Sequence, residues 1–342
     1  MLNQRDKKLT LVSLVLLALV LFSLNQFLPG YYLRIINLIG INIILVASLN
    51  LTNGFTGVFS LGHAGFMAVG AYTSALLTVP IAQKASLLPD LPLWLMNIQL
   101  PFAVALLAAG IMAAICAVII GFPVLRLRGH YLAVATLGFL VIIKVLLTNL
   151  DDFTRGARGI SGLPGITNSW WVYGTMVITL YVLWRFLHSS YGRGIMALRD
   201  DDVAAQALGV NITNHKLMSF CIGAFFAGVG GALWGDLITV ISPNFFSFNQ
   251  TFLLVEMSVI GGMGSLTGAV VGASLMTILP ELLRNLEGGI SLMGVTLPPL
   301  YGLSQLILAV LVILVLIFRP QGIMGRWEFS WKHFKKHNKE EI

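Results

Sequence analysis

Charged residues are scarce in this chain of 342 residues. Only 10% of the sequence is Asp, Glu, Lys or Arg, whereas 57% is hydrophobic. A soluble globular domain carries about 25% charged residues, so this sequence cannot cover a compact body with water-compatible side chains. The scarcity excludes an ordinary soluble protein. It favours a polytopic membrane protein, because one crossing needs about 20 mostly apolar residues.

Cysteine is nearly absent, and neither of its two occurrences indicates chemistry. Cys116 and Cys221 lie inside apolar runs and form no CxxC spacing, so they are predicted to be small buried hydrophobes rather than a disulfide or a metal site. Catalytic constellations are also missing: no Ser-His-Asp, HExxH or paired-carboxylate arrangement stands out. We therefore expect no enzyme activity, no catalytic residue, no metal and no cofactor.

The sequence also speaks against two kinds of ligand, ATP and nucleic acid. The chain has no GxxxxGK[ST] phosphate loop, so it cannot bind ATP by that mechanism. Its net charge of +7 does not indicate nucleic acid, because the basic residues lie at the chain ends and in short loops rather than among aromatic residues on one face. This placement is the one that the positive-inside rule predicts for a membrane protein.

Long apolar runs account for most of the sequence and predict an all-α membrane bundle of about ten transmembrane helices. Eight crossings are the alternative, with one short pair re-entrant. The first run is longer than the core of a signal peptide, and Asn25, Gln26 and Pro29 follow it instead of a small-residue cleavage site, so we expect it to be retained. The clear spans are 9–28, 33–52, 101–122, 131–150, 170–188, 216–240 and 301–318, and the less clear ones are 64–79, 251–262 and 266–283.

Basic residues orient the predicted spans. They cluster in 5–8, 126–128, 193–199 and 319–336, which fall on one side of the membrane after zero, four, six and ten crossings. This side is predicted to be cytoplasmic. Residues 1–8 then form a cytoplasmic N-terminus, 9–318 the transmembrane domain, and 319–342 a basic cytoplasmic tail. The loop 151–168, which carries Arg155 and Arg158, is the exception to the trend.

Two glycine-rich stretches interrupt the hydrophobic pattern. We call residues 54–65 the first break and residues 261–268 the second break. Irregular backbone at membrane depth persists only where protein or a water-filled cavity satisfies it. Paired interruptions in the two halves of a transporter point to the translocation route, whereas close helix packing through small residues is the plainer interpretation. The two interpretations are compatible.

Polar residues inside the apolar runs are the candidates for a translocation pathway, because such residues usually face the interior of a bundle. The alternative is that they only bond neighbouring helices or freed backbone. His63 has no His, Cys or carboxylate partner at ligand spacing, so a metal role is not expected. The candidates are Asn42, Asn50, Asn53, His63 and Glu256.

The long loop 189–215 holds a dense set of charges and predicts a short helix. Asp200 is its expected N-cap, with Asp201 and Asp202 in the first turn, where negative charge suits the helix dipole. Gly209 is placed to end it in a left-handed conformation. Val203, Ala204, Ala207 and Leu208 would share one small apolar face. Such a face suits docking into a groove of another protein, although an ordinary solvated loop is the alternative.

The stretch Leu198-Arg-Asp-Asp-Asp-Val-Ala-Ala-Gln-Ala-Leu-Gly-Val-Asn211 resembles the coupling loop of permease subunits in branched-chain amino acid ABC importers. The Arg-Gly-His-Tyr segment that begins at Arg128 and the chain length resemble the M-type subunit more than its shorter H-type partner. Further segments that carry the resemblance, in order, are 47–51, 60–67, 127–138, 159–164 and 261–272.

This resemblance implies an importer in the bacterial inner membrane. Its expected partners are an H-type permease in a heterodimer, two cytoplasmic ATPase subunits, a periplasmic binding protein and membrane lipid. In the general motif a Glu stands before the two alanines, whereas Asp202 and Val203 precede them here. We therefore expect the coupling role of the loop as a whole. The residues concerned are Arg199, Asp200, Asp201, Asp202, Ala204, Ala205 and Gly209.

The predicted function is therefore the transmembrane translocation of branched-chain or related amino acids, driven by a separate ATPase. One alternative is a permease of the same class for urea or short amides. Another is a self-contained ion-coupled carrier, which needs a relay of ionisable groups; Lys144, Asp236 and Glu256 are few and scattered for that purpose.

Overall fold

The computed structural model describes residues 4–127, 129–287, 291–292, 295–296, 302–325 and 327–328, except for the side chains of 4–14, 17, 285–287, 291–292 and 295–296. Its long or apolar helices are α1 (Gln4–Phe27), α2 (Gly30–Asn50), α3 (His63–Thr78), α6 (Phe102–Val124), α7 (His130–Asn149), α9 (Ser169–Leu187), α12 (Ile212–Ile238), α13 (Phe248–Gly261), α14 (Leu266–Glu287) and α15 (Leu303–Phe318).

Shorter elements connect these helices. The short α-helices are α4 (Ile81–Leu87), α5 (Leu93–Met96), α8 (Asp151–Thr154), α10 (Ser190–Asp200) and α11 (Asp202–Ala207). A π-helix, η1 (Leu51–Phe55), and two 3₁₀ turns, η2 (Gly156–Arg158) and η3 (Pro243–Phe245), accompany them. Strand β1 (Ile160–Ser161) pairs antiparallel with β2 (Val240–Ile241), and β3 (Ser291–Leu292) with β4 (Val295–Thr296).

The coarser part of the predicted fold class is confirmed: the chain is a polytopic helical membrane protein. Six helices are long and apolar enough to cross a membrane, namely α2 with η1, α6, α7, α9, α12 and α14. A seventh crossing is counted if α3 and α4, which bend by 118° at their junction, form one span. The predicted total of ten also includes α1, α13 and α15, whose described apolar stretches are shorter. The tail from residue 329 onward lies outside the described residues.

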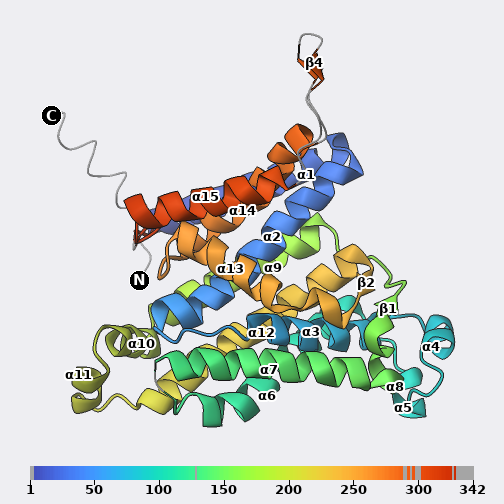
Figure 1. Ribbon diagram of the computed structural model, residues 1–342, viewed down its shortest axis with the longest axis horizontal. Helices are drawn as coiled ribbons and strands as arrows, with labels where there is room; N and C mark the ends of the chain where they lie inside the picture. Colours follow the sequence, from blue (N-terminus) through green and yellow to red (C-terminus); the bar gives the residue numbers. More distant parts are fainter. Residues whose placement is uncertain are drawn as a thin grey trace.

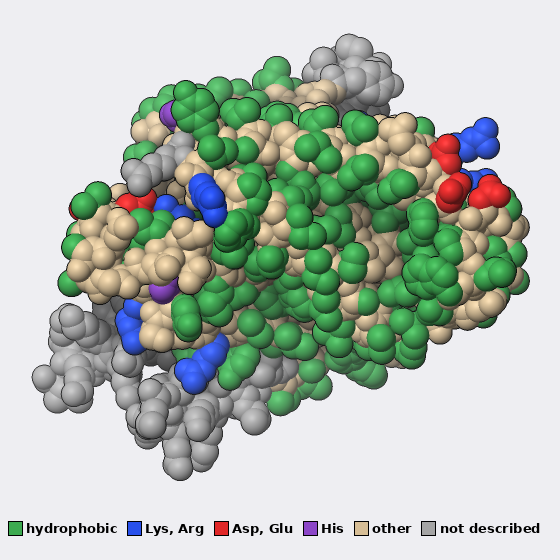
Figure 2. Space-filling view, turned by 90° about the horizontal axis from the view of Figure 1, so that it is seen from below, with side chains coloured by type: hydrophobic (Ala, Val, Ile, Leu, Met, Phe, Trp, Pro, Cys, Tyr) green, Lys and Arg blue, Asp and Glu red, His purple; other side chains and the backbone are tan. Residues whose placement is uncertain are grey.

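Charge separates the two ends of the bundle from its middle. Helices α10 and α11 lie at one end in Figure 1, and α4, α5 and α8 lie at the other. Figure 2 shows charged side chains gathered toward these ends and hydrophobic side chains over the surface between them. An apolar belt between two polar ends is the surface that a bilayer requires of a spanning protein.

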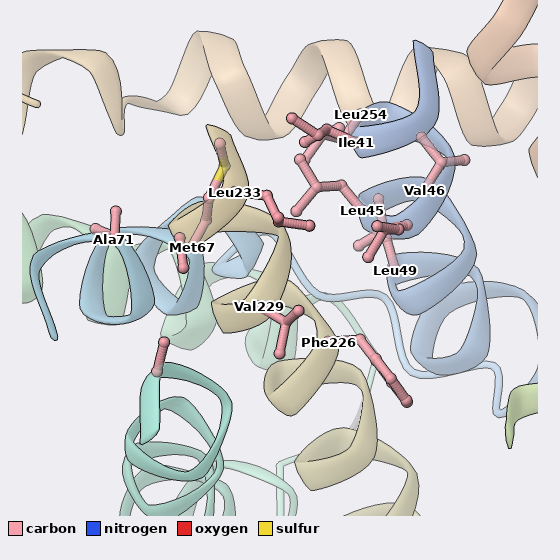
Figure 3. Packing of buried hydrophobic residues seen from close by; sticks show 14 of the residues in the cluster. Ile41, Leu45, Val46, Leu49, Met67, Ala71, Phe226, Val229, Leu233 and Leu254 are labelled. Carbon is pink, nitrogen blue, oxygen red and sulfur yellow. The ribbon is translucent and has the colours of Figure 1, made fainter. Parts of the chain in front are cut away.

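The core lies where α2, α3 and α12 meet. Ile41 and Leu45 of α2, Met67 of α3 and Leu233 of α12 are all buried in one cluster (Figure 3). Helices approach closely here because small residues stand at the crossings: a Cβ on Gly70 of α3 would overlap the backbone of α12. Without a hydrophobic driving force between helices in lipid, such close packing supplies much of the association. The core thereby fixes the ends of α2 and α3, between which the first break lies.

The end that carries α4 and α5 is closed by the β1–β2 pair. Ile160 pairs with Ile241, which ties the loop after α8 to the end of α12. The carboxylate of Asp236 accepts a 2.6 Å hydrogen bond from the Thr167 amide in the same loop. Arg155 and Arg158, the exception to the charge trend, belong to this end of the molecule, away from α10 and α11.

Candidate functional site

The first break, residues 54–65, runs from the end of the π-helix η1, which continues α2, into the first turn of α3, which starts at His63. Asn53 holds it closed through a pair of hydrogen bonds. Its Nδ2 donates to the Ser60 carbonyl at 3.2 Å, and its Oδ1 accepts from the Ser60 amide at 3.0 Å. The backbone that leaves helical geometry here is therefore satisfied by a neighbouring side chain, as irregular structure at membrane depth requires.

Side chains of other helices complete the first break. Thr136 of α7 accepts a hydrogen bond from the Leu61 amide at 2.9 Å, and Thr251 of α13 accepts one from the Ala64 amide at 3.2 Å. The first amides of a helix have no partner inside the helix, so the Thr251 hydroxyl caps α3, whereas Thr136 satisfies an amide of the chain just before the helix. His63 adds a 2.9 Å hydrogen bond between its Nε2 and the hydroxyl of Ser48 on α2.

The second break joins α13 to α14 and is held by Asn50. This residue is fully buried at the end of α2. Its Oδ1 accepts a hydrogen bond from the Gly264 amide at 2.7 Å, and its Nδ2 donates to the Ser265 carbonyl at 2.8 Å. Gly264 has a φ of +90°, a conformation that side-chain-bearing residues rarely adopt. One amide side chain of α2 thus fixes the turn between α13 and α14, and this turn lies more than 200 residues further along the chain.

The segment that follows α15 also folds onto the second break. The Ile323 amide donates to the Ile260 carbonyl at 2.8 Å, at the end of α13. The Ser265 hydroxyl donates to the Trp327 carbonyl at 2.7 Å. Glu328 accepts a 2.6 Å hydrogen bond from the Leu266 amide and so caps the start of α14, where a carboxylate also suits the helix dipole. Three distant parts of the chain therefore meet at this break.

The two breaks touch each other beneath α10. A Cβ on Gly54 would overlap the Gly264 nitrogen and the Asn50 amide oxygen, so only glycine fits there. Arg199, in the last turn of α10, donates through Nη1 to the Gly54 carbonyl at 3.4 Å. We call Asn50, Gly54, Arg199 and Gly264 the glycine junction.

The predicted loop helix is two helices, α10 and α11, with Asp201 between them. The expected N-cap, Asp200, is wrong: Asp201 caps α11, and its Oδ1 accepts from the Val203 and Ala204 amides at 2.8 and 3.0 Å. Asp200 instead ends α10 and pairs with Arg199 at 3.2 Å. The predicted C-cap is confirmed, since Gly209 has a φ of +84° and follows the last turn of α11.

One face of α11 is open to solvent. Val203 is 76% exposed and Leu208 is 84% exposed, and Ala204 and Ala207 lie exposed between them. Ala205 is buried, and a 3.1 Å salt bridge between Asp202 and Lys216 ties α11 to the start of α12. Below α11 lies an open cavity of about 930 Å³, which is also lined by Arg126 and His130.

Comparisons with known proteins identify the class. Residues 31–317 match the family model described as the permease component of the branched-chain amino acid transport system. The chain belongs to this family.

Relatives of two types are similar to this permease. It is 33% identical over 318 residues to the high-affinity branched-chain amino acid transport system permease protein LivM of Escherichia coli, covering 83% of this chain and 68% of that relative. A probable LivM of Methanocaldococcus jannaschii is 23% identical over 83% of this chain and 90% of the relative. The E. coli permease LivH is 29% identical over 54% of this chain and 62% of the relative. Among solved structures, none matches the chain significantly.

The family is one of transport permeases, which are not themselves enzymes. Among the described residues, no group of three or more His, Cys, Asp or Glu side chains could hold a metal ion.

Four of the five pathway candidates bond to other parts of the permease. The Asn42 Nδ2 donates to the Thr277 hydroxyl on α14 at 2.9 Å, and Asn50, Asn53 and His63 make the hydrogen bonds described at the two breaks. All four side chains are buried. Glu256 of α13 is partly exposed, and its side chain makes no hydrogen bond or ion pair with the described residues. That these residues line a pathway stays a prediction.

Sequence reasoning missed the residues that complete the breaks from a distance. The side chains of Thr136, Thr251 and Glu328 each accept a hydrogen bond from a backbone amide in another part of the chain. A threonine inside an apolar helix usually bonds its own helix backbone, as Thr148 does to the Lys144 carbonyl at 2.8 Å. Nothing in the sequence separates Thr136 from Thr148. For Ser265, its place inside the second break is the available signal.

Proposed function

We propose that this permease is the membrane subunit of an ATP-driven importer for branched-chain or closely related amino acids. The observation that carries the proposal is the exposed α10–α11 pair at one end of a bundle of this family. The chain has no phosphate loop, so the energy must come from another subunit. A helix whose exposed face consists of Val203, Ala204, Ala207 and Leu208 is suited to receive that subunit in a groove.

The proposal includes ten crossings with both termini in the cytoplasm. Successive helices alternate in direction between the two ends of the bundle, which supports this count. The end of α1 is joined to the start of α9 by a 3.2 Å hydrogen bond from Ser169 to Asn25, at the end opposite α10. At the other extreme of the chain, the segment after α15 returns to Ile260 and Gly261 near the glycine junction.

Charge supports the orientation. Arg126, Arg193, Arg199 and Lys216 belong to the end that carries α10 and α11. The positive-inside rule places such an end in the cytoplasm. The opposite end then faces the periplasm of a bacterial inner membrane. At that end Arg155 and Arg158 share a groove of about 530 Å³ with Asp90, Asp151 and Asp152, so the positive charge of these two arginines is offset there.

The partners follow from this arrangement. The α10–α11 pair receives one of two cytoplasmic ATPase subunits, and Arg199, Asp200, Asp201, Asp202, Ala204, Ala205 and Gly209 build that docking element. A second, H-type permease completes the membrane dimer, which the similarity to both LivM and LivH supports. A periplasmic binding protein delivers the amino acid to the opposite end. Among the described residues no ion pair links Lys144, Asp236 and Glu256, so nothing favours a self-contained ion-coupled carrier.

The test of transport is reconstitution of the permease with its membrane partner, the ATPase subunits and the binding protein in proteoliposomes. Uptake of radiolabelled leucine is expected to require both ATP hydrolysis and the binding protein. Uptake that persists without ATP and follows a proton or sodium gradient would contradict the proposal. Uptake of urea or acetamide but not of leucine would contradict the substrate class alone.

The test of docking uses the exposed face of α11. Val203→Arg places a charge where an apolar groove is expected, without disturbing the core, because Val203 is 76% exposed. We expect the ATPase subunits no longer to co-purify with this variant. Leu93→Arg is the matched control at the opposite end, since Leu93 is 75% exposed. Normal co-purification of the Val203 variant would refute the docking role.

A further inference from the structure

Arg199 reaches from α10 to both glycine-rich breaks. Its Nη1 donates to the Gly54 carbonyl of the first break at 3.4 Å. A Cβ added to Gly264 of the second break would lie 3.1 Å from the same Nη1. A Cβ added to Gly57 of the first break would lie 3.2 Å from the Arg199 Cγ. The side chain is only 18% exposed. A single residue of the docking element therefore contacts both interruptions.

The planar fork of arginine suits this position. While Nη1 serves Gly54, Nε and Nη2 each donate to the Asp200 carboxylate at 3.2 Å. A guanidinium can hold several acceptors in fixed directions at once, whereas a lysine ammonium acts as a point charge on a flexible stem. Asp200 thus sets the orientation of the fork, and the fork sets the spacing between α10 and the first break.

The α10–α11 pair is built to transmit a displacement. Ile195 and Leu198 bury one face of α10 against the bundle. Only Asp201 separates α10 from α11, and that residue is fixed by its two capping hydrogen bonds. No flexible loop lies between α11 and α10, so a displacement of α11 also displaces α10 and the guanidinium of Arg199.

We propose that Arg199 is a positioning residue that transmits the motion of the docked ATPase to both breaks at once. This inference rests on the proposed function of the chain as an importer permease. Displacement of α10 takes the guanidinium away from the Gly54 carbonyl and from the surface of Gly264. The contact between Gly54 and Gly264 then loses the group that covers it, and of the side chains in the glycine junction Asn50 alone still links the end of α2 to the turn between α13 and α14. ATP hydrolysis is thereby tied to rearrangement of the membrane helices.

The experiment compares Arg199→Gln and Arg199→Lys in the complete reconstituted importer. The measured quantity is the number of leucine molecules taken up per ATP hydrolysed, together with co-purification of the ATPase. We expect Arg199→Gln to assemble and to hydrolyse ATP while the uptake ratio falls about tenfold, within the range typical of coupling between sites. Arg199→Lys keeps the charge but not the fork, so we expect it to restore part of the ratio.

The control is Arg185→Gln. Arg185 is exposed in the last turn of α9, at the same end of the bundle, and the substitution removes the same charge away from the breaks. Its uptake ratio is expected to equal that of the unaltered permease. An unchanged ratio in Arg199→Gln overturns the inference, and so does loss of ATPase co-purification in both Arg199 variants, which would make Arg199 a docking or folding residue. If the unaltered complex shows no ATP-dependent uptake, the proposed function itself fails.

Discussion

The two glycine-rich breaks differ in the origin of the groups that hold them. In the first break the main hydrogen bonds join Asn53 to Ser60, seven residues apart in the sequence. In the second break the turn is held by Asn50, 214 residues before Gly264, and the start of α14 is capped by Glu328, 62 residues after Leu266. The first break therefore has a local hydrogen-bond pair besides its distant acceptors, Thr136 and Thr251, whereas the turn at Gly264 in the second break is held by a residue of a distant element.

This difference assigns the breaks different mechanical roles. A local hydrogen-bond pair re-forms whenever its own loop is intact. A turn held from α2, α10 and the segment after α15 responds to any movement of these elements relative to one another. Elements that move in allosteric transitions are drawn from the less stable parts of a structure, and a turn that several separate elements hold loses its support when these elements part. The second break is thus the expected point of opening, and the first is the more rigid partner at the glycine junction.

The largest effect is expected for Asn50→Leu. The substitution leaves the Gly264 amide buried without a partner, and the Ser265 carbonyl keeps only its hydrogen bond from the Ala269 amide. An unsatisfied buried group costs about 1–3 kcal/mol and a lost hydrogen bond about 1 kcal/mol. The free energy of unfolding of the purified permease should therefore fall by about 2–4 kcal/mol, measured by denaturant titration in detergent micelles. The matched change is Asn53→Leu. Asn53 is 8% exposed and Asn50 is 0% exposed, so water can replace its partners more easily and the loss should be smaller. Equal losses would remove the distinction between the breaks.

A smaller effect is expected for Glu328→Ala. It removes the acceptor for the Leu266 amide, and loss of a helix cap costs about 1 kcal/mol. Glu328→Gln keeps an acceptor oxygen and loses only the charge near the helix start, so it should cost about 0.3–1 kcal/mol. Hydrogen exchange of the amides at 266–268 is the measurement. Faster exchange in the Ala variant but not in the first break is expected; unchanged exchange at 266–268 would show that the segment after α15 does not hold α14.

Thr136→Val tests the hydrogen bond by which α7 satisfies a backbone amide of the first break. It leaves the Leu61 amide without its 2.9 Å acceptor at nearly constant volume, which should lower the free energy of unfolding by about 1 kcal/mol. Thr148→Val is the control on the same helix, because the Thr148 hydroxyl bonds only to its own helix at Lys144. A loss in the control as large as in Thr136→Val would mean that the distant hydrogen bond contributes nothing of its own.

The smallest effect is expected for Asn42→Leu, which removes a hydrogen bond between α2 and α14 that lies outside both breaks. Interhelical hydrogen bonds in membranes contribute about 0.6 kcal/mol on average. A double-mutant cycle with Thr277→Val measures the coupling energy directly. A coupling energy close to the loss in Asn50→Leu would show that the breaks are no more sensitive than the rest of the interface.

Much of the fold could be predicted because the positions of its helices depend on local sequence patterns. Each predicted apolar range overlaps a helix, and Gly209 ends α11 as its conformational freedom suggests. The N-cap could not be placed, because Asp200, Asp201 and Asp202 are equally good caps in isolation. The choice falls to Asp201 because burial of Ile195 and Leu198 keeps α10 helical through Asp200.

The contacts of the glycine junction could not be predicted, for a different reason. The sequence shows that Asn50 is polar and that Gly264 lies in a turn, but their pairing exists only after α2, α13 and α14 have packed. The same holds for Glu328, whose role as a cap of α14 depends on the path of the chain after α15. Local pattern therefore finds the breaks, and tertiary packing decides what holds them.

Hydrogen exchange of the second break in the complete importer tests the central claim most directly. The exchange of residues 261–268 would be followed with and without trapped ATP, in the unaltered permease and in Arg199→Gln. We predict that ATP accelerates exchange at 261–268 more than at 54–65 in the unaltered permease, and that Arg199→Gln abolishes this difference. Exchange at 261–268 that is unaffected by ATP, or that responds equally in the variant, would contradict the account.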